Sequence, residues 1–259
     1  REAALAFGAV GARVALVARR RAALEEVACA IAKRGGEALV VPADVTRQRA
    51  VKSAFSAAVK RFGRLDVVVN NAGILIPAQV TGLRAADLRA MLQVNLFGAL
   101  YVMQQAVAAM RRQENGGCVV NVASLAGRRG ISPLGGYCAS KFALVGLTEA
   151  LRTELHGMPI HVALVMPGVI DTAMAEGITH DAEFQDIWPA ALNMPAAWVV
   201  WAIFAAARFR LVEIAVPPGA ATLEKLAALV PGLTDSVLHW GTAATHFLAD
   251  LLGRARAGG

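Results

Sequence analysis

Short, continuous runs of apolar residues alternate with longer amphipathic stretches along this chain, from its first residues to Pro217. Such uninterrupted apolar runs are typical of parallel strands that are buried on both faces, whereas half-exposed strands alternate apolar and polar residues. Repetition of strand, helix and strand implies right-handed crossover connections. The alternation therefore predicts an α/β fold in three layers, with a doubly wound parallel sheet between two layers of helices.

The predicted elements can be assigned to residue ranges. Strands are expected at Arg13–Ala18, Ala38–Pro42, Leu65–Asn70, Cys118–Ala123, His161–Pro167 and Val212–Pro217. Helices are expected over about Arg21–Arg34, Arg47–Phe62, Ala85–Gln113, Tyr137–His156 and Ala196–Arg208. No linker rich in Ser or Pro, no low-complexity stretch and no short repeat interrupts this order, so we expect residues 1–259 to form a single domain.

The chain opens with REAALAFGAVGA, the pattern of a helix, and the first predicted strand follows it. A doubly wound nucleotide-binding domain begins instead with a strand and a glycine-rich turn, and the next helix faces the pyrophosphate. By this comparison we expect the sequence to lack that first strand and the phosphate loop. The missing strand would lie between Arg13–Ala18 and Leu65–Asn70, so both should have an unpaired edge.

The composition argues against several classes of protein. The longest apolar run, Ala196–Ala207, is shorter than the roughly 20 residues of a membrane-spanning helix, and no secretory leader is recognisable. The basic residues behind the net charge of +7 are scattered, which argues against a nucleic-acid partner. Three cysteines and five separated histidines lack the spacing of a disulfide framework or a metal site. We therefore expect no metal and a cytoplasmic location.

The sharpest local signal is YCASK, from Tyr137 to Lys141. Positions four apart share one face of a helix, so the phenol and the ammonium could point into the same cleft. A nearby ammonium favours the phenolate, and we expect it to lower the pKa of Tyr137 from about 10 toward the working pH. Such a tyrosine can exchange a proton with an alcohol or ketone oxygen. The same pair also arises by chance on surface helices.

Three further segments follow predicted strands at the same edge of the sheet. Ser124 follows Cys118–Ala123, NNAG covers Asn70–Gly73, and PGVIDT covers Pro167–Thr172. Ligands of open α/β sheets bind outside the carboxyl ends of the strands, and Asn and Gly there suit tight turns and close approach of the backbone. Each segment alone would be an ordinary turn, but together they predict a ligand site.

With these motifs, and with ADV (Ala43–Val45), VNLFG (Val94–Gly98) and NVASLAG (Asn121–Gly127), the chain resembles the classical short-chain dehydrogenases/reductases. The resemblance extends from Arg1 to about Thr172, is weaker at Val212–Pro217, and does not include residues 219–259. It implies a Rossmann-like fold and an oxidoreductase that interconverts a secondary alcohol and a ketone with a nicotinamide cofactor. It also implies a homodimer or homotetramer.

The resemblance implies a role for each matching residue. Tyr137 would be the catalytic acid/base, Ser124 would hold and polarise the substrate oxygen, and Lys141 would lower the pKa of Tyr137 and bind the nicotinamide ribose. Asn95 would hold a water that links Lys141 to solvent, or cap or bridge backbone groups, and both roles are compatible. The remaining cofactor contacts would be Asp44 and Val45 at the adenine, Asn70, Ala72 and Gly73 at the adjacent ribose, and Pro167, Gly168, Val169 and Thr172 at the nicotinamide end. Cys138 is expected to be a packing residue.

The end of the strand Arg13–Ala18 bears on the choice of cofactor. An acidic residue there would bind the ribose 2′-hydroxyl of NAD and repel a 2′-phosphate. Here Ala18 is followed by Arg19 and Arg20, and a guanidinium suits a phosphate dianion. The sequence therefore favours NADP(H) over NAD(H), with Arg19 as the phosphate ligand.

The substrate side is assigned only by position. After a core of about residues 1–172, residues of about 173–210 are expected to form a substrate lid and a helix, and about 218–259 a C-terminal extension. The apolar spacing of the extension suits closure of the substrate pocket, a subunit interface or a membrane surface, and the first two are favoured. An apolar lid and extension favour a hydrophobic alcohol or ketone. The alternatives are a catalytically inactive fragment and a cofactor-binding or scaffold protein without turnover.

Overall fold

The computed structural model describes residues 1–172 and 193–220, together with Thr222, Lys225, Ala228, Leu229 and Gly232. The expected lid therefore lies largely outside the described residues, and so does most of the expected C-terminal extension. No helix in the described ranges is long and apolar enough to cross a membrane. In the same ranges, no three His, Cys, Asp or Glu side chains are grouped so that they could hold a metal ion.

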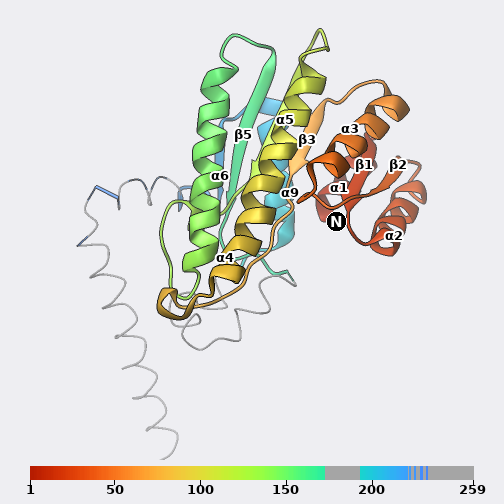
Figure 1. Cartoon of the computed structure of the whole chain (residues 1–259). Coiled ribbons are helices and arrows are strands. Elements are labelled where there is room, and N and C mark those ends of the chain that lie inside the picture. Colours follow the sequence, from red (N-terminus) through yellow and green to blue (C-terminus); the bar gives the residue numbers. More distant parts are fainter. Residues whose placement is uncertain (173–192, 221, 223–224, 226–227, 230–231, 233–259) are drawn as a thin grey trace, which may run out of the picture.

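The described strands are all parallel and form two sheets (Figure 1). In the first, β1 (Arg13–Ala18) pairs with β2 (Glu37–Pro42) from Arg13 opposite Glu37 to Ala18 opposite Pro42. The second has the order β3 (Val67–Asn70), β4 (Gly117–Val122), β5 (Ile160–Pro167) and β6 (Glu213–Val216). No described strand pairs with the second edge of β1 or β3, so the prediction of unpaired edges on these two strands is confirmed.

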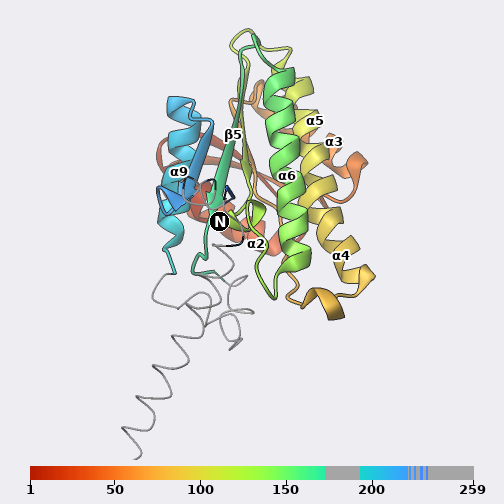
Figure 2. The same cartoon turned by 90° about the vertical axis from the view of Figure 1, so that its left-hand side faces the viewer.

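Helices cover both faces of the strands, which gives the three expected layers (Figure 2). The helices α1 (Glu2–Ala9), α2 (Arg21–Ala32) and α9 (Ala196–Phe209) form one layer, in which α1 contacts both α2 and α9. The rings of Phe7 and Phe204 stack between α1 and α9 with centroids 4.1 Å apart. The helices α3 (Gln48–Phe62), α4 (Ala85–Leu92), α5 (Ala99–Met110) and α6 (Gly135–Glu154) form the other layer.

The packing of β4 and β5 explains why their sequences are continuously apolar. Successive side chains of a strand point to opposite faces, so Val119 and Val162 belong to the cluster packed with α5 and α6. Their neighbours Val120 and Ala163 belong to the cluster packed with α9. Because both faces are covered, every position of these strands has to be apolar or internally hydrogen-bonded.

One predicted helix is interrupted. Instead of a single helix over Ala85–Gln113, the chain forms α4, a π-helical segment η2 (Gln93–Gly98) and then α5. Close contact with a neighbouring segment accompanies the interruption, since a Cβ atom on Gly98 would lie 2.9 Å from Cγ2 of Val45. A π-helical turn is frequent at functional sites, and here it contains Asn95, one of the predicted site residues.

Candidate active site

The structure brings Ser124, Tyr137 and Lys141 together at the carboxyl end of β4. Ser124 lies just beyond β4, and its side chain lies near enough to that of Tyr137 on α6 to lower the pKa of the phenol. One helical turn later, the Nζ atom of Lys141 lies 5.6 Å from the centroid of the Tyr137 ring. All three side chains are buried, and only 4% of the Lys141 surface is exposed. The four-residue spacing thus directs the phenol and the ammonium to the same place, as the sequence predicts.

The pKa of Tyr137 shifts in the direction opposite to the prediction. Burial raises the pKa of Tyr137 to about 12, and the side chain of Ser124 only partly opposes this. Burial also lowers the pKa of Lys141 to about 8, and its ammonium donates a hydrogen bond to the carbonyl oxygen of Val122 at 3.0 Å. The expectation that the pKa of Tyr137 falls toward the working pH is therefore wrong for this structure, because desolvation of the phenolate raises the pKa.

Asn95 connects the π-helical segment to the loop after β3 and to α6. Its Oδ1 atom accepts a hydrogen bond from the backbone N–H of Ile74 at 2.8 Å, and its Nδ2 atom donates to the Ile74 carbonyl at 2.9 Å. Nδ2 also donates to Oγ of Ser140 at 2.9 Å, and that hydroxyl donates to the carbonyl of Tyr137 at 2.7 Å. Asn95 therefore bridges backbone groups, which is one of the two roles considered for it.

Ser140 is a site residue that the sequence analysis missed. Its hydroxyl joins Asn95 to the backbone of Tyr137, so it ties the π-helical segment to the turn of α6 that carries both Tyr137 and Lys141. The available signal was a polar residue inside YCASK, at a position that is fully buried in the structure. That position could not be recognised as buried before the packing of α6 was known.

Gly73 lies where a larger side chain would enter the site. A Cβ atom at this position would be 3.3 Å from Oδ1 of Asn95 and 3.7 Å from Nζ of Lys141. Its neighbour Ala72 is exposed at the same edge. The absence of a side chain at Gly73 therefore lets the backbone come close to the Asn95 amide and the Lys141 ammonium.

The side-chain amide of Asn70 donates its hydrogen bonds to buried groups of α5 and β4. Its Nδ2 atom donates to the carbonyl of Ala99 at 3.1 Å and to Oδ1 of Asn121 at 3.0 Å. Asn121 in turn donates to Oγ1 of Thr148 at 3.0 Å, and Thr148 donates to the carbonyl of Leu144 on α6. This buried chain of hydrogen bonds holds β3, β4, α5 and α6 in register below the site.

Arg19 and Asp44 lie close together at the carboxyl ends of β1 and β2. The backbone N–H of Ala43 donates to the carbonyl of Ala18 at 3.0 Å, which brings the two strand ends side by side. Asp44 accepts hydrogen bonds from the N–H and the hydroxyl of Thr46, and these bonds lower its pKa, with a smaller contribution from the charge of Arg19. Arg19 itself is exposed, so its guanidinium is accessible to an anion.

The segment Pro167–Thr172 continues from β5 to the same edge. Oγ of Ser124 donates to the carbonyl of Pro167 at 3.2 Å, and the N–H of Gly168 donates to the carbonyl of Val216 at 2.7 Å. Val169 accepts from the N–H of Met194 at 3.1 Å, and the hydroxyl of Thr172 donates to the carbonyl of Ile170 at 3.2 Å. The first of these bonds connects a predicted cofactor contact to Ser124.

The cysteine inside the YCASK motif is surrounded by packed apolar side chains. Cys138 is buried among Met91, Ala126 and Leu134, and burial raises the pKa of its thiol. A thiol with a raised pKa is a poor nucleophile. The expectation that Cys138 serves packing agrees with this environment.

The family model of the short chain dehydrogenases matches residues 1–183 of this chain. The uncharacterized oxidoreductase YxnA of Bacillus subtilis is 33% identical over 233 residues, which cover 88% of this chain and 65% of the relative. The CLA biosynthesis dehydrogenase/reductase of Lactiplantibacillus plantarum is 33% identical over 179 residues, which cover 68% of this chain and 63% of that protein. The chain thus spans a little less than two thirds of the length of these two relatives.

Solved structures with the same fold agree with this match. A short-chain type dehydrogenase/reductase from Mycobacterium marinum is 29% identical with a TM-score of 0.76, over 83% of this chain and 87% of that one. An NAD⁺-bound xylitol dehydrogenase is 32% identical with a TM-score of 0.63, over 66% and 65%. The structure of ElxO with NADP bound is 26% identical with a TM-score of 0.72, over 80% and 85%. The chain belongs to the short chain dehydrogenases, a family of oxidoreductases.

Proposed function

We propose that this protein is an NADP(H)-dependent oxidoreductase that interconverts a secondary alcohol and a ketone, with Tyr137 as the acid/base. The observation that carries the proposal is that Ser124, Tyr137 and Lys141 lie buried together beyond β4, with the Lys141 ammonium 5.6 Å from the centroid of the Tyr137 ring. Three buried polar side chains at the carboxyl edge of a parallel sheet suit a reacting oxygen atom better than they suit a packed core.

Each residue has a defined part in the proposed reaction. In ketone reduction the phenol of Tyr137 donates its proton to the substrate oxygen, and in alcohol oxidation the phenolate takes that proton back. To hold the same oxygen by a second hydrogen bond, the Ser124 hydroxyl would turn its proton from the Pro167 carbonyl, to which it donates here, to the substrate. A nicotinamide cofactor, when bound, supplies or accepts the hydride. The raised pKa of Tyr137 keeps the phenol protonated, which is the form that ketone reduction needs.

The residues present fit such a cofactor. The Lys141 ammonium has three N–H donors and uses one on the Val122 carbonyl, and the residue at the strand edge beside it is Gly73, without a side chain. Lys141 would bind ribose hydroxyls there. Asp44 and Val45 would border the adenine, and the segment Pro167–Thr172 would border the nicotinamide.

Replacement of Tyr137 by Phe tests the proposed acid/base. We expect turnover of ketones with NADPH to fall by about 100- to 10,000-fold, the usual contribution of a general acid, and Ser124→Ala to act in the same direction. Tyr101→Phe is the matched control, because Tyr101 on α5 is the other of the two tyrosines. Full turnover in Tyr137→Phe would instead support a cofactor-binding or scaffold protein without catalysis.

The preference for NADP(H) rests on Arg19. Its exposed guanidinium follows β1, where no acidic side chain stands to bind a ribose 2′-hydroxyl. The related structures include both NAD⁺-bound and NADP-bound proteins, so the preference has to be measured. We expect Arg19→Asp to shift the NADPH/NADH selectivity toward NADH by about 10- to 100-fold, the value of a lost charge-assisted hydrogen bond. Arg20→Asp makes the same charge change one residue later and should have a smaller effect, and an equal effect would show that only net charge matters.

We also propose a small hydrophobic carbonyl or alcohol as the substrate and a homodimer or homotetramer as the assembly. Large apolar side chains that are exposed in the single chain, among them Phe97, Phe142 and Trp201, support the second proposal. Sedimentation of the purified protein measures the assembly, and a panel of ketones of increasing apolar length measures the substrate preference.

A further inference from the structure

Arg128 lies at the end of the turn that carries Ser124. The turn contains the short 3₁₀ helix η3 (Leu125–Gly127). The N–H of Gly127 donates to the carbonyl of Ser124 at 2.9 Å, and the N–H of Arg128 donates to the carbonyl of Leu125 at 2.9 Å. Because the backbone of Arg128 belongs to the same hydrogen-bonded turn, a movement of Arg128 would also move Ser124.

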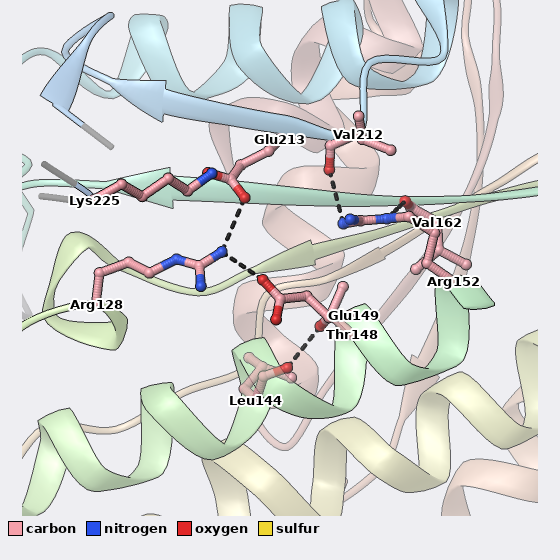
Figure 3. A network of polar contacts seen from close by, with 9 residues as sticks. All are labelled: Arg128, Leu144, Thr148, Glu149, Arg152, Val162, Val212, Glu213 and Lys225. Carbon is pink, nitrogen blue, oxygen red and sulfur yellow. Dashed lines mark hydrogen bonds and ion pairs between the residues drawn. The ribbon is translucent and has the colours of Figure 1, made fainter. Parts of the chain in front are cut away.

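The side chain of Arg128 bridges two carboxylates from other elements (Figure 3). Its Nη2 atom donates to Oε1 of Glu149 on α6 at 2.6 Å and to Oε2 of Glu213 at the start of β6 at 2.9 Å. The other carboxylate oxygen of Glu213 is 2.7 Å from Nζ of Lys225. These four residues are called the Arg128 cluster. Its two cations balance its two carboxylates, so the cluster has no net charge.

The centre of the cluster is largely shielded from water. The exposed fraction of the side chain is only 20% for Arg128 and 17% for Glu213, whereas Glu149 and Lys225 at its two ends are 45% and 56% exposed, so the shielded part is the Arg128–Glu213 pair. Burial opposes the charged forms of both groups, but the partners outweigh it, so the pKa of Arg128 is raised and that of Glu213 is lowered. A shielded bridge from one guanidinium to two carboxylates holds its geometry better than an exposed pair.

The turn from Ser124 to Arg128, called the serine turn, touches α6 at a second point. A Cβ atom on Gly127 would lie 3.0 Å from the carbonyl oxygen of Lys141, so the turn rests against α6 at the level of the catalytic residues. The bond from Arg128 reaches Glu149, two helical turns further along the same helix. With contacts at both places, the turn cannot slide along α6 without breaking the bond to Glu149.

We propose that Arg128 is a positioning residue that holds Ser124 in register with Tyr137, by joining the serine turn to Glu149 of α6 and Glu213 of β6. The proposal rests on the proposed function, in which Ser124 and Tyr137 hold the same substrate oxygen. Lys225 extends the support to the C-terminal part of the chain, because it bonds the carboxylate that Arg128 uses.

Arg152 offers a matched control. It also lies on α6, and it donates to the carbonyl of Val162 on β5 at 3.3 Å and to that of Val212 beside β6 at 3.1 Å (Figure 3). It therefore ties the same helix to β5 and to the start of β6, but neither of these bonds reaches the serine turn. A general loosening of α6 should follow from either substitution, whereas a displaced Ser124 should follow only from the loss of Arg128.

The test compares Arg128→Met, Arg128→Lys and Arg152→Met in a Tyr101→Phe background, where Tyr137 is the single tyrosine. The NMR signal of isotope-labelled Tyr137, at the ring carbon that bears the hydroxyl, reports how closely Ser124 approaches the phenol, without any turnover. We expect Arg128→Met to move this signal toward its position in Ser124→Ala. In Arg128→Lys the signal should return to its position in the parent protein, because a single nitrogen makes both carboxylate bonds. Arg152→Met should leave the signal at that position.

Kinetics provide the second readout. We expect Arg128→Met to lower kcat by about 10- to 100-fold, as for other small misplacements of reacting groups, with an unchanged KM for NADPH. An unmoved Tyr137 signal in Arg128→Met, or an equal movement in Arg152→Met, would overturn the proposal. If the parent protein lacks turnover, the proposed function fails while the NMR comparison still decides the positioning role. If Arg128→Met does not fold, Glu149→Met removes the bond to α6 alone, and the Tyr137 signal and kcat are measured in that variant instead.

Discussion

Lys141 is a buried ammonium, and its replacement by methionine tests the electrostatics of the site without any assay of turnover. The residue is 4% exposed, and the hydrogen bond of its Nζ atom to the carbonyl of Val122 is 3.0 Å long. Methionine keeps an unbranched side chain of similar length and removes the charge. Lys141→Met therefore removes both the desolvation penalty and this hydrogen bond.

The magnitude follows from the pKa. Burial lowers the pKa of Lys141 from 10.5 to about 8, a shift that corresponds to about 3 kcal/mol. Between these two pH values the unfolded chain binds more protons than the folded chain, so the stability of the parent protein rises with pH. The penalty is present in full below about pH 8 and is relieved as the pH approaches 10.5.

The lost hydrogen bond acts in the opposite direction at every pH. It is worth about 1 kcal/mol. We therefore expect Lys141→Met to be more stable than the parent by about 2 kcal/mol at neutral pH. The advantage should shrink as the pH rises toward 10.5 and then become a deficit of about 1 kcal/mol.

Urea unfolding of the two proteins without nucleotide, at several pH values from neutral to about 10, measures the difference. Tyr137, whose pKa is raised from 10 to about 12, makes both proteins less stable as the pH rises from 10 through 12, so the comparison is best made below pH 10. A variant that is less stable than the parent by the same amount at every pH would refute the reasoning, because the charge of Lys141 would then carry no burial penalty.

Two glycine substitutions test the packing around the site and at the opposite end of the sheet, and a third, Gly63→Ala, is the control for the second. Gly73→Ala places a Cβ atom 3.3 Å from Oδ1 of Asn95. We expect the displaced amide to lower the free energy of unfolding by about 1 kcal/mol and turnover by about 10-fold. Unchanged turnover would contradict a role of the Asn95 amide in holding the site. Gly116→Ala, at a φ of +57°, drives a Cβ atom into the carbonyl of Pro159 and should destabilise the protein by about 3 kcal/mol or more in urea unfolding. Gly63→Ala, at a φ of +81° with open space around it, should lose only the about 1–2 kcal/mol of the left-handed backbone, and equal losses at Gly116 and Gly63 would exclude the clash.

The sequence predicted the strands because the signal for a buried parallel strand is local. The runs at Arg13–Ala18 and His161–Pro167 are apolar throughout, and the structure has strands at Arg13–Ala18 and Ile160–Pro167. The unpaired edges of β1 and β3 were predictable for a related reason, since the order of strands follows from the order of the strand–helix units. The interruption of the helix predicted over Ala85–Gln113 was not predictable, because it accompanies contacts of Gly98 and Asn95 with segments far away in the sequence.

The sequence by itself determined that Tyr137 and Lys141 share a face of one helix, since four residues make about one turn, and that Ser124 follows a strand at the same edge. Only the tertiary structure decided the pKa of Tyr137, because desolvation depends on the segments that surround a group and not on its neighbours in the chain. The same holds for the bonds of Arg128, whose partners lie 21 and 85 residues away. Periodicity and spacing act over one or two turns, whereas burial and ion pairing depend on which distant segments the fold brings into contact.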